Sequence, residues 1–491
     1  MSVVIAVMKF IVKFFPEITI KSKPVRRQFV AQLRKNITRI LKTVDPDVVV
    51  EREWDRISIL SDVKTDDEQQ ALVNALGAIP GIAHFIDVQE YPLGDFDDIL
   101  KRVLPVYRDR LVGKTFAMRC KRTGQHDFRS IDVERHVGGG MNQHSEARGV
   151  QLKAPDVTVA IEIRNQTLYV VNQRHQGLGG FPMGSLDPVL SLVSGGFDST
   201  VASYLTMKRG MRTHFCFCSL GGRDHEMGVK EISLYLWLKY GSSHRVRFVT
   251  VPFEDVVAEL LGKIENSQMG VILKRMMLRA GTAIAEQLNV DALVTGECVS
   301  QVSSQTLKNL AVIDRATDHL VLRPLITANK EEIIKISAEI GAEAFAAAIP
   351  EYCGVISVNP TTRARPERIA VEEDKFDFGI LERAIESAEM VTIDELVGDD
   401  FSDSGVEIMG IPSSDSIIID IRHPDEESLI PLQGAALTVT RMPFYELHSR
   451  LAELDREQSY MLYCGKGVMS KLQASHLLEL GYSRVKVYKP A

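Results

Sequence analysis

The clearest chemistry in this sequence is carried by a loop with two glycines, Ser194-Gly-Gly-Phe-Asp-Ser199. An apolar run at 189–193 precedes it and an apolar-periodic segment from Val201 follows it, which predicts a buried strand, a tight turn and a helix start. Gly195 and Gly196 would let backbone N–H groups approach an anion, and the helix N-terminus would add its positive dipole end. The loop lacks the lysine and the spacing of a Walker A motif, which disfavours γ-phosphate transfer. It therefore indicates a nucleotide phosphate site, and an ordinary glycine turn is the alternative.

Strands and helices must alternate around this loop to hold it. Apolar runs at 213–218, 246–251 and 292–295 alternate with helix-like segments at 228–239, 253–261 and 271–288. This alternation predicts a parallel, doubly wound sheet, in which ligands bind at the carboxyl ends of the strands. Asp198 would then lie beside the phosphates, where it would place magnesium or fix the loop, and a helix cap is the alternative.

Other polar residues follow the same strands and helices. Gly296 comes after an apolar strand and would allow close approach of an adenine or a ribose. The stretch Gln301–Gln305 could bind nucleotide edges, although turn and cap roles are as frequent for such residues. Lys274 in the long helical segment and Lys330 further along are candidates to neutralise phosphate charge.

A second reactive group is Cys464, which ends the apolar strand 461–463 and begins the loop Cys464-Gly-Lys-Gly-Val-Met-Ser470. An amphipathic helix is predicted to follow. A cysteine ringed by loop amides at a helix N-terminus is expected to be a reactive thiolate, and the same amides can hold a persulfide anion. A buried structural cysteine is the alternative. Cys353 becomes a resolving thiol if this persulfide can reach it, because thiol attack on a persulfide yields a disulfide.

Composition limits the protein class. The chain has 491 residues and an apolar fraction of 45%, which suggests about three soluble domains. Its net charge of −7 argues against global nucleic-acid binding, so any RNA surface must be local. The six cysteines have no paired CxxC spacing, and neither a membrane span nor a signal peptide is apparent, so a reducing cytoplasm is expected. We expect Cys120, Cys216, Cys218 and Cys298 to be structural, with no metal site.

The N-terminal third contains a local basic region. Residues 21–39 are rich in Lys and Arg, and after an alternating strand at 116–120 basic side chains cluster around glycines: Lys121, Arg122, His126, Arg129 and Arg135. Basic side chains beside glycine N–H groups suit phosphate contacts, so these five are predicted to bind RNA. The runs 157–163 and 167–171 predict a closing hairpin. A basic α/β module with no RNA role is the alternative.

Several motifs resemble known families. Ser194–Ser199 resembles the pyrophosphate (PP) loop of ATP pyrophosphatases, the 80–82 and 116–140 stretches resemble a THUMP domain, and the Cys464 loop resembles a rhodanese domain. Over 9–490 the chain is similar to the long form of the bacterial tRNA 4-thiouridine synthetases, also called tRNA sulfurtransferases. Further motifs carry this similarity: Phe15-Pro-Glu-Ile-Thr-Ile-Lys-Ser22, His126-Asp-Phe-Arg-Ser-Ile-Asp-Val-Glu-Arg135, Gln268–Met277 and Pro350–Ser357.

The resemblance implies a multidomain α/β fold. Its expected parts are a ferredoxin-like domain (1–62), a THUMP domain (63–174), a doubly wound PP-loop domain (175–397), a linker (398–411) and a rhodanese domain (412–491). It also implies that ATP binds Leu192, Val193, Ser194, Gly195, Gly196, Asp198, Ser199, Lys274, Gly296 and Gln305. Asp198 and Lys330 would be required for activity, with Mg²⁺ accompanying ATP.

The implied reaction is ATP-dependent thiolation of tRNA uridine 8. ATP would adenylate the base, Cys464 would carry persulfide sulfur from a cysteine desulfurase, and Cys353 would form a disulfide with Cys464 that a reductant resets. Direct persulfide attack and prior release of hydrosulfide both stay open. The family also implies sulfur donation to the carrier protein of thiazole synthesis, and the sequence leaves a homodimer open.

Two alternatives and one departure from the family pattern accompany this interpretation. An RNA-binding sulfur relay without adenylation and 2-thiolation of a tRNA base are the alternatives. The Cys464 loop lacks the arginine that common rhodanese loops carry near Met469. This departure favours protein-to-protein persulfide delivery over free thiosulfate.

Overall fold

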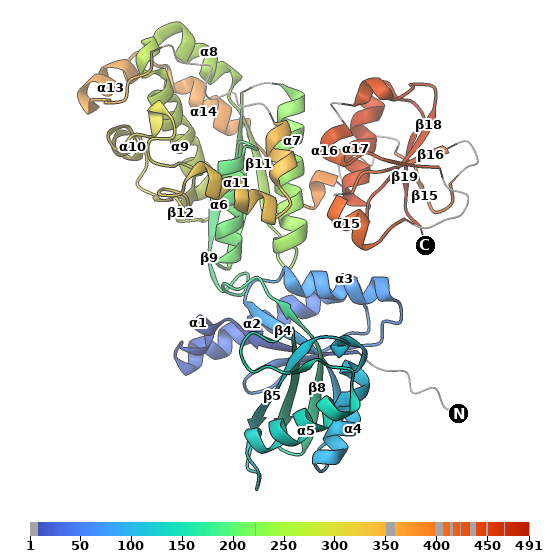
Figure 1. Cartoon of the computed structure of the whole chain (residues 1–491). Coiled ribbons are helices and arrows are strands. Elements are labelled where there is room, and N and C mark those ends of the chain that lie inside the picture. The colour runs from blue at the N-terminus through green and yellow to red at the C-terminus, as the bar shows by residue number, and fades with distance from the viewer. Residues whose placement is uncertain are drawn as a thin grey trace. The chain divides into compact units, whose positions relative to one another are not determined.

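The computed structural model describes residues 8–220, 222–349, 359–397, 406–412, 416–422, 424–432, 438–447, 450–465 and 467–490. The chain divides into two compact units, Met1–Pro182 and Met183–Ala491 (Figure 1). Among the described residues, no helix combines the length and apolar character that a membrane crossing requires.

The first unit is built on one eight-stranded sheet with the order β2-β3-β1-β4-β8-β7-β5-β6. The strands are β1 (Met8–Phe14), β2 (Val49–Arg52), β3 (Ile57–Ser61), β4 (Ile82–Pro92), β5 (Thr115–Thr123), β6 (Gly149–Val150), β7 (Val157–Arg164) and β8 (Thr167–Gln176). Neighbours are antiparallel except that β5 pairs parallel with β6 and β7. The predicted hairpin is confirmed as β7–β8, and the turn contains Asn165 at φ +50°. A single sheet thus runs through both parts of this unit, which the sequence predicts to be ferredoxin-like and THUMP domains.

The helices of this unit are α1 (Pro16–Thr19), α2 (Lys23–Leu41), α3 (Asp66–Gly77), α4 (Phe96–Tyr107) and α5 (Ser130–His144). The glycines 138–140, expected to offer N–H groups to phosphate, lie inside α5. That expectation is wrong, because N–H groups inside a helix donate to carbonyls four residues earlier. Gly140 serves packing instead, since a Cβ there would overlap Leu100 of α4.

The central sheet of the second unit has the order β13-β12-β9-β10-β11-β14. Its strands are β9 (Leu186–Leu192), β10 (Met211–Ser219), β11 (Arg247–Pro252), β12 (Ala292–Val294), β13 (Leu320–Leu322) and β14 (Glu389–Thr392). All neighbours are parallel except β14, which is antiparallel to β11. Along β9, Val189 packs in one apolar cluster and Leu190 in another, so both faces are covered. The predicted doubly wound sheet is confirmed.

The helices that flank this sheet are α6 (Phe197–Lys208), α7 (Arg223–Leu236), α8 (Glu254–Lys263), α9 (Met269–Gln287), α10 (Leu307–Ile313), α11 (Lys330–Glu339), α12 (Glu343–Ala348), α13 (Pro366–Glu373) and α14 (Phe378–Glu386). The charged composition of 367–397 by itself predicts a helical segment, and this prediction is wrong at Glu389–Thr392, which forms β14. Met390 and Val391 pair with β11, a distant partner that a local charged window does not reveal.

A five-stranded parallel sheet with the order β15-β19-β18-β16-β17 forms the C-terminal part. The strands are β15 (Ile408–Met409), β16 (Ser416–Asp420), β17 (Val439–Arg441), β18 (Ser459–Tyr463) and β19 (Val485–Tyr488), and the helices are α15 (Pro424–Leu429), α16 (Phe444–Leu447) and α17 (Val468–Glu479). Strand β15 lies within the predicted linker 398–411, of which 398–405 fall outside the described residues.

His214 on β10 makes the stability of the central sheet depend on pH. Its Nδ1 accepts the backbone N–H of Arg247 at 2.9 Å, and burial, with Arg212 and Arg247 nearby, lowers its pKa from 6.5 to about 4. As pH falls, His214 is protonated in the unfolded chain at a higher pH than in the folded protein. The free energy of unfolding should therefore fall as pH drops from 6.5 towards about 4. In a Trp54→Phe background, the urea midpoint reported by Trp237 fluorescence should follow this trend.

The matched variant is His214→Asn, which keeps an acceptor and does not titrate. We expect its urea midpoint to change less across the same pH range. An identical pH dependence in both proteins would contradict the assignment.

Candidate active site

The loop Ser194–Ser199 joins β9 to α6, as the sequence predicts. Gly195 adopts φ +82°, and a Cβ there would lie 2.6 Å from Ile349 Cδ1, so position 195 needs glycine. The Ser199 hydroxyl accepts the Ser194 N–H at 3.2 Å and donates to the Gly196 carbonyl at 3.2 Å. The loop is thus held in shape by its own last residue, and the first-turn N–H groups of α6 remain available for a ligand.

A cavity of about 320 Å³ adjoins this loop. It is lined by the ends of β9 and β10, by α9 and by residues 295–305. Nine residues predicted to bind nucleotide line it, and Gly195 does not: Leu192, Val193, Ser194, Gly196, Asp198, Ser199, Lys274, Gly296 and Gln305. Phe217 and Met277 belong to its apolar wall. Its volume and mixed lining suit a small ligand with apolar and charged parts.

Asp198 lies in the first turn of α6 and faces two partners. Its Oδ1 accepts Lys330 Nζ at 2.9 Å, and its Oδ2 accepts Gln301 Nε2 at 2.7 Å. The N-cap of α6 is Gly196, and no side-chain cap bond forms there, so the capping alternative for Asp198 is wrong. Lys330, the first residue of α11, is therefore brought to the cavity edge although it does not line the cavity.

Glu297 is a site residue that sequence reasoning missed. Its carboxylate accepts Lys274 Nζ at 2.7 Å and Arg323 Nε at 2.8 Å, and its side chain is 9% exposed. Burial alone would raise the pKa of Glu297, but the two cations outweigh burial and lower it. A glutamate directly after a buried strand was the available signal, because such a carboxylate needs cationic partners.

Gly296 and Gln305 also line this cavity. A Cβ on Gly296 would lie 2.5 Å from the carbonyl carbon of Asp198, so the absence of a side chain lets the strand end touch the loop. Gln305 is buried, and its Oε1 accepts the Cys298 N–H at 3.4 Å. Part of the Gln305 amide thus stabilises its own loop.

Cys464 lies between β18 and α17. Its Sγ accepts the Ser470 N–H at 3.3 Å and lies 3.3 Å from Ser470 Oγ. Gly467, at φ +72°, donates its N–H to the Cys464 carbonyl at 3.1 Å. The sulfur is half-buried and faces the first turn of a helix. Cys353 falls outside the described residues, so its predicted pairing with Cys464 stays a prediction.

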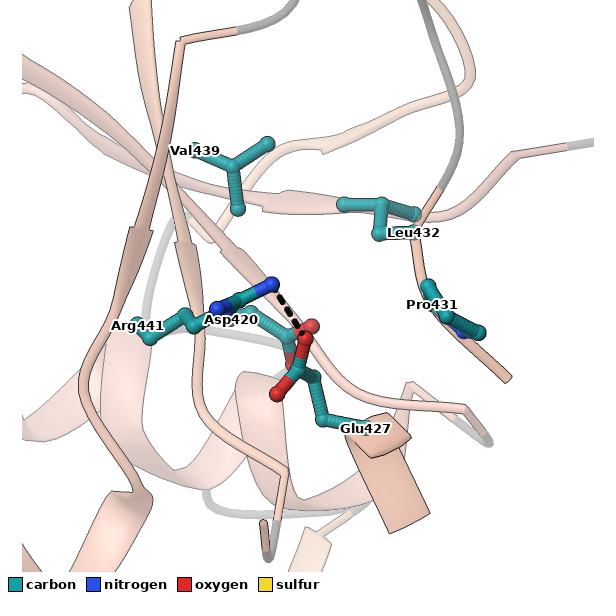
Figure 2. A pocket seen from close by; sticks show the side chains of 6 residues that line it. All are labelled: Asp420, Glu427, Pro431, Leu432, Val439 and Arg441. Carbon is teal, nitrogen blue, oxygen red and sulfur yellow. Dashed lines mark ion pairs between the residues drawn. The ribbon is translucent and has the colours of Figure 1, made fainter. Parts of the chain in front are cut away.

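A second cavity, of about 270 Å³, lies in the C-terminal sheet (Figure 2). Glu427 and Arg441 form an ion pair across it at 2.8 Å. Asp420, also in its lining, is held by Arg422, whose guanidinium lies 4.8 Å from the ring centre of Tyr463. The described lining of this cavity does not include Cys464.

The other four cysteines are buried thiols outside any disulfide: Cys120, Cys216, Cys218 and Cys298. Burial raises the pKa of the Cys120 thiol to about 11. Cys216 and Cys218 share one face of β10 and line the cavity beside the Ser194–Ser199 loop. Within the described ranges, no group of three or more His, Cys, Asp or Glu side chains could hold a metal ion.

The five predicted RNA contacts all lie on β5, on α5 or between them. Lys121, Arg129 and Arg135 are exposed, and Arg129 pairs with Asp132 at 3.3 Å. Arg122 and His126 instead pack together: Arg122 NH1 lies 2.8 Å from His126 Nδ1, and His126 Nε2 lies 2.7 Å from the Asn165 carbonyl. The first three can contact a ligand directly, whereas the other two shape the loop.

Comparisons with known proteins match every part of this architecture. The family described as thiamine biosynthesis protein (ThiI) matches residues 184–378, the ThiI ferredoxin-like domain 9–85, the THUMP domain 94–171 and the rhodanese-like domain 407–490. A crystal structure of a 4-thiouridine synthetase–RNA complex with bound ATP aligns at TM-score 0.69 and 26% identity, covering 79% of this chain and 99% of that one.

Relatives that align over nearly the whole chain are tRNA sulfurtransferases. The tRNA sulfurtransferase of Azotobacter vinelandii is 55% identical, with 99% of this chain and 100% of that protein covered. The tRNA sulfurtransferase of Pseudomonas putida is 53% identical, with 98% and 100% covered. The chain belongs to the tRNA sulfurtransferase family.

Proposed function

We propose that this protein makes 4-thiouridine at position 8 of tRNA through adenylation of the uridine and sulfur transfer from a persulfide on Cys464. The observation that carries the proposal is the cavity beside the Ser194–Ser199 loop, which gathers the residues expected to bind ATP. The similarity to a 4-thiouridine synthetase solved with RNA and bound ATP supports this ligand and this substrate.

ATP would bind with its base against the apolar wall and its phosphates on the loop. Backbone N–H groups of Gly195, Gly196 and the first turn of α6 would donate to phosphate oxygens, and Lys274 would add a positive charge. Magnesium fits a site of this kind when one or two carboxylates and the substrate phosphates hold it, and Asp198 would be its protein ligand. Lys330 keeps Asp198 oriented through their ion pair at 2.9 Å.

In the first step the uracil O4 bonds to the α-phosphorus and pyrophosphate leaves. The terminal persulfide sulfur on Cys464 then bonds to C4 and AMP leaves. The Cys353 thiolate attacks Cys464 Sγ, which frees the thiouridine and leaves a disulfide that a two-electron reductant resets. The Ser470 N–H, 3.3 Å from Cys464 Sγ, stabilises negative charge on sulfur before and after transfer.

The proposed partners follow from this sequence of steps. A cysteine desulfurase would load Cys464, and tRNA would contact exposed Lys121, Arg129 and Arg135. Sulfur donation to the carrier protein of thiazole synthesis is proposed from the match to a thiamine biosynthesis family. This second role needs the Cys464 domain and not the ATP cavity.

Thiouridine formation in the purified system tests the proposal. tRNA incubated with the protein, ATP, cysteine and a desulfurase should gain near-ultraviolet absorbance from 4-thiouridine, and omission of ATP or of the desulfurase should abolish the gain. tRNA-dependent AMP release should accompany it. Thiolation without AMP release would favour the relay without adenylation, and digestion with mass analysis that found 2-thiouridine would favour the other alternative.

A further inference from the structure

Glu297 presents an electrostatic problem in the cavity wall. It lies where a polyphosphate is expected, and a buried carboxylate beside a polyanion is strongly unfavourable unless cations compensate it. The two oxygens of the carboxylate have different cationic partners. Oε1 accepts Lys274 Nζ at 2.7 Å, and Oε2 accepts Arg323 Nε at 2.8 Å and the Thr295 hydroxyl at 3.0 Å.

The two cations occupy different places. Lys274 lines the cavity, whereas Arg323 is not among the described lining residues. Arg323 is fixed further by Asp314, which accepts its NH1 at 3.1 Å. Arg323 thus lies between two carboxylates, those of Glu297 and Asp314, and Lys274 is the cation of this group that lines the cavity.

We propose that Glu297 is a positioning residue that holds the Lys274 ammonium towards the phosphates of ATP, with Arg323 as its compensating charge. The inference rests on the proposed binding of ATP in this cavity. A lysine side chain has four rotatable bonds, so a fixed carboxylate 2.7 Å away removes much of the entropy that phosphate binding would otherwise cost. Arg323 keeps that carboxylate from repelling the nucleotide.

The test is a double-mutant cycle on ATP affinity, measured by calorimetry on the full-length protein without tRNA. Glu297→Gln should weaken ATP binding about tenfold, as expected for loss of a charge-assisted hydrogen bond. In a Lys274→Met background the same substitution should cause no further loss, because Glu297 acts through Lys274. Arg323→Gln should also weaken ATP binding although Arg323 does not line the cavity.

Glu373→Gln is the matched control. Glu373 is as buried as Glu297, at 7% exposed. It pairs at 2.6 Å with Arg275, which lies on α9 next to Lys274, and neither Glu373 nor Arg275 lines the cavity. Its ATP affinity should be unchanged, and tRNA affinity should be unchanged in every variant.

If the wild type binds ATP, two outcomes would contradict the proposed role of Glu297. One is an equal loss from Glu297→Gln in both backgrounds, and the other is unchanged or tighter binding in the single variant. A wild type that fails to bind ATP would instead overturn the proposed function and this inference with it. If Glu297→Gln does not fold, Arg323→Gln with and without Lys274→Met gives the same decision.

Discussion

Cys464→Ser is expected to abolish thiouridine formation while tRNA-dependent pyrophosphate release in a single turnover persists. Serine keeps the size of the side chain, but its hydroxyl cannot carry a persulfide. The groups that we propose for adenylation lie on other elements, around the loop between β9 and α6, so loss of the sulfur carrier leaves them in place. Thiouridine would be measured by its near-ultraviolet absorbance and pyrophosphate by an enzyme-coupled assay.

Cys120→Ser is the matched control for this prediction. Cys120 is buried on β5 in the first unit, and burial raises the pKa of its thiol to about 11, so it has no role in sulfur transfer at neutral pH. Full activity is expected from this variant. Thiolation at the wild-type rate by Cys464→Ser would make the C-terminal domain accessory and remove Cys464 from the mechanism.

The parts of the site that the sequence predicted are those fixed by local pattern. The strand–loop–helix around Ser194–Ser199 depends on neighbouring residues, and the structure has it as β9, loop and α6. The same holds for the β18–Cys464–α17 segment. In each, hydrophobic periodicity and glycines within a short window specify the geometry.

The parts that the sequence did not predict depend on distant partners. Glu297 acquires its role from Lys274, 23 residues earlier, and from Arg323, 26 residues later. Strand β14 exists because it pairs with β11. The glycines 138–140 look like a loop by composition, yet they lie inside α5, where Gly140 allows close packing on Leu100 of α4 despite the low helix propensity of glycine. Such tertiary contacts leave no signal in a local window.

Gly296→Ala is expected to weaken ATP binding by about 10- to 100-fold, the range that overpacking energies imply. The added Cβ would lie 2.5 Å from the Asp198 carbonyl carbon and 2.6 Å from the Ser199 nitrogen. Both are backbone atoms, which cannot rotate away as a flexible side chain can. The end of β12 must therefore move from the first turn of α6, and Glu297 moves with it, displacing Lys274 from the phosphates.

Gly270→Ala separates this crowding from a general effect of alanine in the cavity wall. Gly270 also lines the cavity, on α9, but a Cβ there would meet nothing within 4 Å. Alanine at 270 should leave ATP affinity unchanged and slightly favour the helix. Calorimetric titration of both variants with ATP gives the comparison, and tRNA affinity, which we propose to depend on the exposed basic residues of the first unit, should be unchanged in both. Equal ATP affinity for the two variants would mean that contact between β12 and the loop is not what holds the phosphate site together.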